Sequence, residues 1–215
     1  MPGKETVLQR MIDCGVVAVV RAPSSEELLR VSQAICAGGV DCIEITMTTP
    51  NALAVISEVS RELGGRAVVG VGSVTDPDTA QAAIEAGAEF VVGPILNFDV
   101  IEMAGRHSKV VVPGAFTPTE ILQAWNAGAD VVKVFPASVG GPAYFKAVLA
   151  PLPQVRLTPT GGVNLKTAGE FIKAGAVFLG VGSALVDKKL VAEGNFPELQ
   201  KRAEQFVGAV RTARQ

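Results

Sequence analysis

The chain has 215 residues and a formal net charge of -2; 48% of its residues are hydrophobic and 19% are charged. This composition supports a large buried core and excludes a disordered chain, and the lack of a basic run argues against a nucleic-acid partner. The sequence holds no apolar run near the roughly 20 residues that span a bilayer, and its start lacks the pattern of a secretory signal. We therefore expect a cytoplasmic protein with no nucleic-acid partner and no membrane partner.

Short apolar runs rich in β-branched residues recur along the chain and predict strands covered on both faces, as in a parallel sheet. The predicted strands are Val16–Arg21, Cys42–Met47, Ala67–Ser73, Glu89–Gly93, Lys109–Pro113, Val131–Phe135, Val155–Thr160 and Val177–Val181. Helical patterns fill the segments between them. Two of these begin with the residues of a capping box, Ser24 with Glu27 and Thr117 with Glu120.

A short repeat marks the passage from helix to strand. Its copies are Ala37-Gly38-Gly39, Ala86-Gly87-Ala88, Ala127-Gly128-Ala129 and Ala174-Gly175-Ala176. Glycine at this place favours the left-handed conformation that ends a helix. The copies stand about 40–50 residues apart, which is two strand–helix units each, so they predict eight strands.

We therefore predict an α/β protein in which residues 1–215 form a single domain, a (β/α)8 TIM barrel. The segment from about Lys4 to Ile12 is predicted to be an N-terminal helix that caps the bottom of the barrel, and Phe196–Arg214 the last outer helix. An open Rossmann sheet is the alternative. However, Gly70-Val71-Gly72 and Gly180-Val181-Gly182 lack the third glycine of its fingerprint.

Lys133 is the candidate nucleophile, because it lies within the apolar run Val131-Val132-Lys133-Val134-Phe135-Pro136. Barrel enzymes place catalytic groups at the C-terminal ends of strands. Burial lowers the pKa of a lysine and leaves a neutral amine that can attack a carbonyl carbon. The alternative is a lysine whose ammonium group reaches solvent at the mouth of the barrel.

Glu44 and Thr46 share one face of a predicted strand, because side chains alternate along it, while Ile43 and Ile45 lie on the other face. The isoleucines suit the layer between strands and helices, so we expect Glu44 and Thr46 to point into the barrel. A carboxylate beside a lysine there is either half of a buried ion pair or a general acid/base with a raised pKa.

Polar and glycine-rich strand ends are candidates for binding anionic groups. Arg21 ends the first predicted strand, where it can clamp a carboxylate or simply lie exposed, and Ser73 closes the third strand after a glycine. Gly161-Gly162 and Gly182-Ser183 follow the last two predicted strands, where barrels commonly bind phosphate. They predict a phosphorylated ligand; the alternative is glycines that serve tight turns.

Cysteine and histidine usage predicts no metal site and no Ser-His-Asp catalysis, and we expect no cofactor. Cys14, Cys36 and Cys42 are odd in number and irregularly spaced, which indicates free thiols. His107 is the only histidine and falls in a helix-to-strand loop, at the end of the barrel opposite to the expected site.

Several segments resemble one known family, the 2-keto-3-deoxy-6-phosphogluconate (KDPG)/4-hydroxy-2-oxoglutarate (KHG) aldolases. The likeness covers nearly the whole chain, and its motifs follow the order of the family. They are Ile43-Glu44-Ile45-Thr46, Gly70-Val71-Gly72-Ser73-Val74, Val112-Pro113-Gly114, Val132-Lys133-Val134-Phe135-Pro136-Ala137 and Pro159-Thr160-Gly161-Gly162-Val163.

The resemblance implies a class I, metal-free aldolase with a (β/α)8 barrel that forms a homotrimer. Lys133 matches its Schiff-base lysine and Glu44 its acid/base glutamate, while Ser73 replaces a threonine that contacts the pyruvyl carboxylate. The remaining substrate-binding matches are the pocket residues Pro94 and Phe135 and the phosphate loops with Thr160, Gly161, Gly162, Gly182 and Ser183.

The chain departs from the family at Thr48, where many members use an arginine on the substrate carboxylate. Arg21 resembles the arginine that other members place at the end of the first strand, so we expect Arg21 to hold that carboxylate. The expected partner is a phosphorylated 2-keto acid, KDPG, cleaved to pyruvate and glyceraldehyde 3-phosphate. The alternatives are the 6-phosphogalactonate epimer or KHG as substrate, and a non-covalent phosphosugar isomerase or binding barrel.

Overall fold

The computed structural model describes residues 3–21 and 24–215, in which parallel strands and helices alternate. The strands are β1 (Val16–Val20), β2 (Cys42–Thr46), β3 (Val68–Gly72), β4 (Phe90–Val92), β5 (Val110–Val112), β6 (Gly114–Ala115), β7 (Val132–Val134), β8 (Leu157–Pro159) and β9 (Leu179–Val181). The helices are α1 (Lys4–Cys14), α2 (Ser25–Ala37), α3 (Ala52–Leu63), α4 (Pro77–Glu85), α5 (Phe98–Arg106), α6 (Pro118–Asn126), α7 (Gly141–Leu149), α8 (Leu165–Lys173), α9 (Lys188–Ala192) and α10 (Phe196–Arg214).

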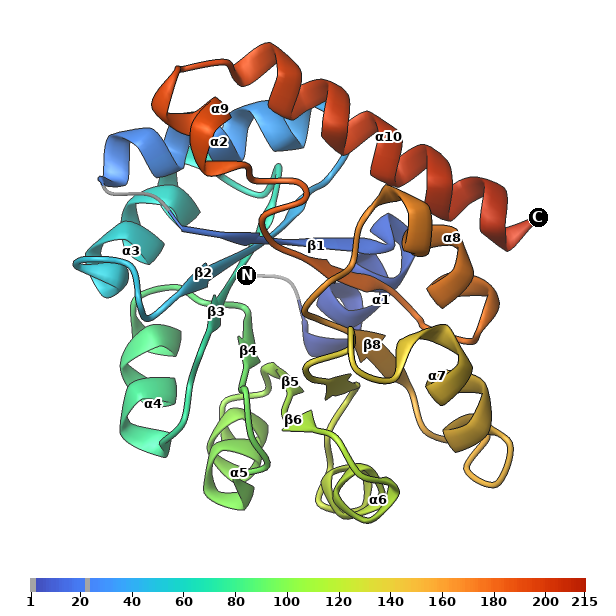
Figure 1. Cartoon of the computed structure of the whole chain (residues 1–215). Coiled ribbons are helices and arrows are strands. Elements are labelled where there is room, and N and C mark those ends of the chain that lie inside the picture. Colours follow the sequence, from blue (N-terminus) through green and yellow to red (C-terminus); the bar gives the residue numbers. More distant parts are fainter. Residues whose placement is uncertain (1–2, 22–23) are drawn as a thin grey trace.

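The strands pair in two parallel sheets, one in the order β5-β4-β3-β2-β1-β9 and one in the order β6-β7-β8. Only Pro113 separates β5 from β6, and single bridges join Leu157 to Ala176 and Thr160 to Gly180, between the β8 and β9 segments. Figure 1 shows the strands curled around a centre, with the helices outside them. The fold is thus α/β with a curled parallel sheet.

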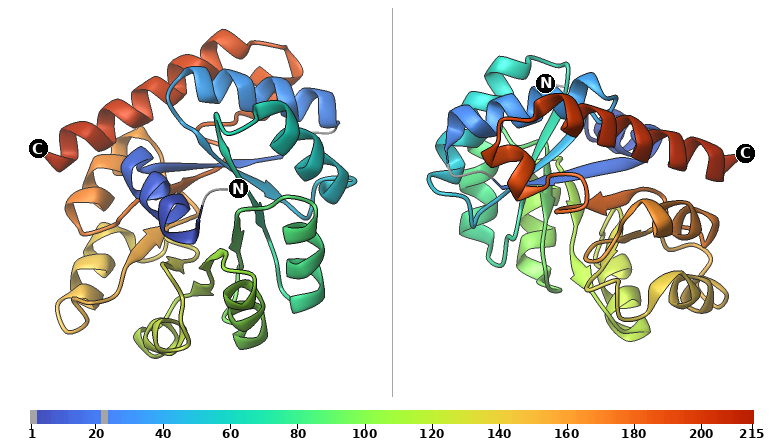
Figure 2. Two further views of the ribbon diagram at one scale, coloured as in Figure 1. Left: turned by 180° about the vertical axis from the view of Figure 1, so that it is seen from behind. Right: turned by 45° about the horizontal axis from the view of Figure 1, so that its top comes forward.

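Two apolar clusters lie on the two faces of this sheet. The larger cluster contains Ile43, Ile45, Val132 and Val134 together with helix residues such as Leu28 of α2. The smaller cluster fills the inner side; it contains Val17, Cys42, Val68, Phe90, Val110 and Val131 from the strands and their flanks, and Val7 and Met11 from α1. Helix α1 packs against β1, β2 and β5, and it lies across the strands when the molecule is seen from behind (Figure 2, left).

Each predicted strand overlaps an observed one, but the observed strands are shorter, because their terminal residues belong to the adjoining turns. Strand β6 and the short helix α9 were not predicted. The first and last predicted helices are confirmed, with α1 running two residues further, to Cys14. No helix in the described ranges is both long and apolar enough to cross a membrane.

The sequence signals predicted for helix ends are confirmed in most cases but not in all. The repeat glycines Gly39, Gly87, Gly128 and Gly175 all have positive φ, between 90° and 110°, as predicted for helix stops. Thr117 and Glu120 form the full capping box. The capping box predicted for Ser24 and Glu27 is wrong in part: Ser24 accepts a hydrogen bond from the Glu27 amide, but the glutamate side chain does not return one.

Candidate active site

Lys133 and Glu44 project from the sheet toward the same interior. Two positions earlier on their own segments, Val131 and Cys42 belong to the inner apolar cluster. Because side chains alternate along a strand, Lys133 and Glu44 lie on that inner side as well, one step nearer the C-terminal ends of the strands. The interior therefore has an apolar layer beside α1 and a layer above it that carries an amine and a carboxylate.

Glycines on the neighbouring strands allow close packing next to Glu44 and next to the strand that carries Lys133. A Cβ atom built on Gly72 would lie 1.9 Å from the Oε1 atom of Glu44. Gly114, which pairs with Lys133 in the sheet, comes so close to Pro94 that an added Cβ would lie 2.3 Å from the Pro94 carbonyl carbon. Pro94 is thus packed against β6, the strand that pairs with the strand of the lysine.

Burial controls the ionisation of both groups, because Glu44 is only 4% exposed and Lys133 only 5% exposed. Burial raises the pKa of Glu44, while the nearby charges of Lys133 and Arg21 act in the opposite direction. Burial lowers the pKa of Lys133; the Glu44 charge opposes this shift and the Arg21 charge adds to it. The site thus favours a neutral amine next to a carboxyl group able to carry a proton.

Arg21 lies at the end of β1, where its Nε donates a hydrogen bond of 3.2 Å to the Thr46 hydroxyl oxygen. The hydroxyl groups of Thr46 and Thr48 are also hydrogen-bonded, at 2.8 Å. Arg21 is exposed, whereas Thr46 is fully buried. The exposed guanidinium is therefore anchored on the same strand that carries Glu44.

A cavity of about 600 Å³ opens above this layer. The predicted binding residues that line it are Arg21, Phe135, Thr160, Gly161, Gly162, Gly182 and Ser183. The Phe135 ring centroid lies 5.0 Å from the Nζ atom of Lys133, so this ring connects the cavity with the buried amine. Within the described residues, no group accepts a hydrogen bond from the backbone N–H of Gly162 or Ser183, which leaves two donors for a ligand.

Ser73 and Pro94 do not line that cavity. Ser73 follows Gly72 at the end of β3 and has a φ of 63°, a left-handed conformation that is uncommon for residues other than glycine. His107 follows α5 at the N-terminal side of β5 and is exposed, away from these groups as predicted.

Sequence reasoning missed other residues of the cavity wall, among them Asn164 and Asp187. Each is the N-cap of the following helix, and the Asp187 carboxylate accepts hydrogen bonds from the amides of Lys189 and Leu190. Those backbone bonds lower the pKa of Asp187. An Asn or Asp before a helix is a readable capping signal, but it does not indicate which cavity the cap borders.

The chain also matches known proteins along most of its length. The family model for KDPG and KHG aldolase matches residues 7–202. A 2-dehydro-3-deoxy-phosphogluconate aldolase of Treponema pallidum (strain Nichols) is 32% identical over 95% of this chain and 98% of its own. A 2-dehydro-3-deoxy-6-phosphogalactonate aldolase of Escherichia coli (strain K12) is 32% identical over 92% and 95% of the two chains.

Among solved structures, a KDPG aldolase from Legionella pneumophila with pyruvate captured as a covalent carbinolamine intermediate aligns with a TM-score of 0.86 and 25% identity. The alignment covers 92% of this chain and 96% of that one. Motif order, fold and overall similarity agree, and the chain belongs to the KDPG and KHG aldolase family.

Proposed function

We propose that this protein is a class I aldolase that cleaves KDPG to pyruvate and glyceraldehyde 3-phosphate through a Schiff base on Lys133. The observation that carries the proposal is the buried pair in the interior layer. Burial depresses the pKa of Lys133 and raises that of Glu44, so the pair provides a nucleophilic amine and a proton carrier together.

In the cleavage direction, the neutral amine of Lys133 attacks the C2 ketone to give a carbinolamine, and loss of water gives an iminium ion. Glu44 transfers the protons of this step and then accepts the proton of the C4 hydroxyl. The C3–C4 bond breaks, its electron pair moves into the iminium to form an enamine, and the aldehyde leaves. Protonation of the enamine at C3 and hydrolysis release pyruvate and restore the amine.

The remaining site residues bind the two anionic ends of the substrate. Arg21, held by Thr46, binds the carboxylate, and Ser73 donates a second hydrogen bond to it. Phe135 and Pro94 form apolar walls beside the lysine. Thr160, Gly161, Gly162, Gly182 and Ser183 bind the phosphate, whose binding energy orients the distant reacting carbon atoms.

The same proposal includes the finer architecture. The bridges between the β8 and β9 segments, and the direct passage from β5 to β6, support closure of the curled sheet into one (β/α)8 barrel, with residues 1–215 as a single domain and α1 as the cap at its lower end. By resemblance to the family, we further propose a homotrimer in the cytoplasm that needs neither metal nor cofactor for this reaction.

The test is incubation with pyruvate and sodium borohydride, followed by mass spectrometry of the peptides. We expect a reduced pyruvyl adduct on the Lys133 peptide and none on the Lys109 peptide. Lys109 is the matched control because it is also buried, but its Nζ atom forms an ion pair of 2.9 Å with the Glu89 carboxylate. A folded protein without an adduct would favour a non-covalent isomerase or a binding protein instead.

Substrate choice needs a separate comparison, because the galactonate relative is as similar to this chain as the gluconate relative. We expect kcat/KM to be highest for KDPG among KDPG, its 6-phosphogalactonate epimer and KHG. KHG lacks the phosphate that the glycine loops would bind. If the epimer is cleaved faster, the aldolase assignment stands and the substrate changes.

A further inference from the structure

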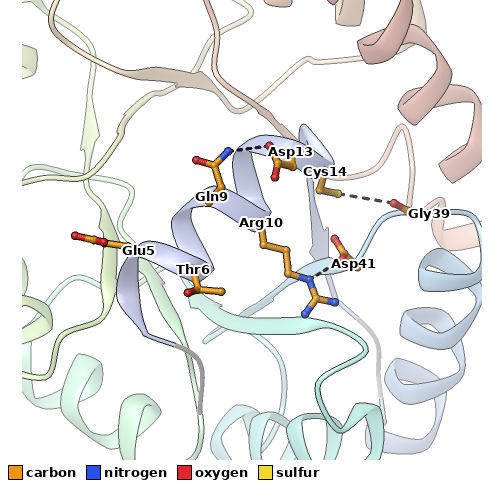
Figure 3. A pocket seen from close by; sticks show the side chains of 8 residues that line it. All are labelled: Glu5, Thr6, Gln9, Arg10, Asp13, Cys14, Gly39 and Asp41. Atoms are coloured by element: carbon orange, nitrogen blue, oxygen red, sulfur yellow. Dashed lines mark hydrogen bonds and ion pairs between the residues drawn. The ribbon is translucent and has the colours of Figure 1, made fainter.

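A second cluster of reactive side chains lies at the opposite ends of the strands from Lys133. Helix α1 ends at Cys14, and Asp41 and Cys42 stand at the start of β2. The two sulfur atoms and one carboxylate oxygen of these residues all lie within 4.8 Å of one another. Cys42 is fully buried, whereas Cys14 and Asp41 border a cavity of about 640 Å³ on the α1 side (Figure 3).

Hydrogen bonds and one ion pair hold the three groups of the cluster in place. Arg10 binds Oδ2 of Asp41 at 2.6 Å, and this ion pair fixes the carboxylate so that Oδ1 faces the Cys42 thiol at 3.6 Å. The Cys14 thiol donates to the carbonyl oxygen of Val16 at 3.1 Å and lies 3.8 Å from that of Gly39. Figure 3 shows Cys14 pointing toward Gly39, with Asp41 and Arg10 beside them at one end of the cavity.

We propose that Cys14, Cys42 and Asp41 form a binding site for a thiophilic divalent cation such as Zn²⁺. A water molecule in the adjoining cavity would supply the fourth ligand. Two thiolates select a soft or borderline metal over Mg²⁺ or Ca²⁺. Neighbouring ligand atoms of a tetrahedral zinc site stand somewhat under 4 Å apart, given zinc–sulfur bonds of about 2.3 Å. The cluster thus needs only small side-chain rotations to close around the ion.

The expected consequence is structural rather than catalytic. The ion would connect the end of α1 to the start of β2, two segments joined otherwise by apolar packing and by the Arg10–Asp41 pair. Its ligand Cys42 belongs to the inner apolar cluster, and Glu44 follows two residues later on β2, nearer the C-terminal ends of the strands. Metal binding should therefore stabilise the protein and leave the rate of aldol cleavage within about twofold of its metal-free value.

The experiment titrates the full-length, reduced protein with Co²⁺ and then displaces Co²⁺ with Zn²⁺. We expect one equivalent of Co²⁺ to give a thiolate-to-cobalt charge-transfer band. Cys14→Ser and Cys42→Ser should each abolish the band or weaken binding at least 100-fold, since loss of even an outer-shell partner costs about 10–100-fold. Zn²⁺ at 100 times its Kd should raise Tm by roughly 5–10 °C.

Cys36→Ser is the matched control, because Cys36 is near enough for the Cys14 charge to affect its pKa but lies outside the cluster. It should keep the band and the Tm shift. Asp41→Asn tests the third ligand and should weaken binding while the two thiolates still give a band. No band in the native protein, or a band lost equally in Cys36→Ser, would overturn the proposal. If Cys42→Ser does not fold, the partly exposed Cys14 and Asp41 variants decide the matter.

Discussion

Replacing Gly72 with alanine should displace the acid/base carboxylate without touching the lysine. The added methyl carbon would lie 1.9 Å from Oε1 of Glu44, 2.6 Å from Cδ and 2.7 Å from Cγ. Non-bonded heavy atoms prefer about 3.5–4.0 Å, so the carboxylate has to move by on the order of 1.5 Å. The Glu44 side chain cannot turn outward, because the opposite face of β2 is filled by apolar packing.

The magnitude follows from this displacement. A misplacement of about 1 Å costs on the order of 100-fold in rate, so kcat for KDPG cleavage should fall about 100-fold in Gly72→Ala. Overpacking costs about 1–3 kcal/mol of stability, which corresponds to a fall in Tm of roughly 2–12 °C. Lys133 keeps its surroundings, so borohydride and pyruvate should still label it to completion, although more slowly.

The assay is the rate of pyruvate release, with Gly70→Ala as the control. Gly70 lies on the same face of β3, but a Cβ there would meet the Phe90 ring at 2.4 Å and not the carboxylate. The two variants should lose similar stability, and Gly72→Ala should lose at least 10-fold more activity. A Gly72→Ala enzyme with more than half of the native kcat, or a Gly70→Ala enzyme that is equally impaired, would refute the role assigned to Glu44.

Three further predictions concern the charges of the site. Glu44→Gln removes the carboxylate that raises the pKa of Lys133, so the pH midpoint for borohydride trapping should move to lower pH; an unchanged midpoint would contradict their coupling. The raised pKa of Glu44 means that the folded state binds the proton more tightly, so stability falls as pH rises from about 4.3 through the raised value. Glu44→Gln should therefore unfold at higher denaturant concentration than the native protein at pH 7, with a smaller difference at pH 4, and an equal difference at both would be inconsistent with that cause. Arg21→Ala should reduce kcat/KM about 10–100-fold, as expected for a lost hydrogen bond to a charged group, and Arg21→Lys should recover part of it.

Alternation and burial made the central pair predictable. A lysine in Val131-Val132-Lys133-Val134 and a glutamate between Ile43 and Ile45 stand out because charged residues are rarely fully buried without a partner or a task. The period of two then placed Glu44 and Thr46 on the inner face, whereas Lys133 was singled out by its apolar run alone. The convergence of Gly161-Gly162 with Gly182-Ser183 in one cavity followed from the parallel order of the strands.

Contacts between segments distant in sequence were beyond this reasoning. Nothing in the sequence showed that Arg21 would rest on Thr46, or that Ser73 would adopt positive φ, because both depend on how neighbouring strand ends turn. The break between β5 and β6 was also invisible, although Pro113 marks its place. Cys14 and Cys42 looked like unrelated thiols, since their closeness depends on how α1 packs against the start of β2.

Two polar side chains of the site occupy space that a neighbouring glycine leaves free because it has no Cβ. Gly72 serves Glu44 in this way, and Gly180 serves Thr160, whose hydroxyl oxygen would lie 2.2 Å from an added Cβ. In the layer beside α1, Phe178 lies two residues before Gly180 and Val68 lies four residues before Gly72, and the space above the intervening Gly70 is taken by the Phe90 ring. What distinguishes the active-site layer is therefore the neighbour that fills the space above each glycine, which is the Phe90 ring at Gly70 but a polar side chain at Gly72 and Gly180. Substitutions of Gly72 and Gly180 should accordingly impair catalysis more than a substitution of Gly70.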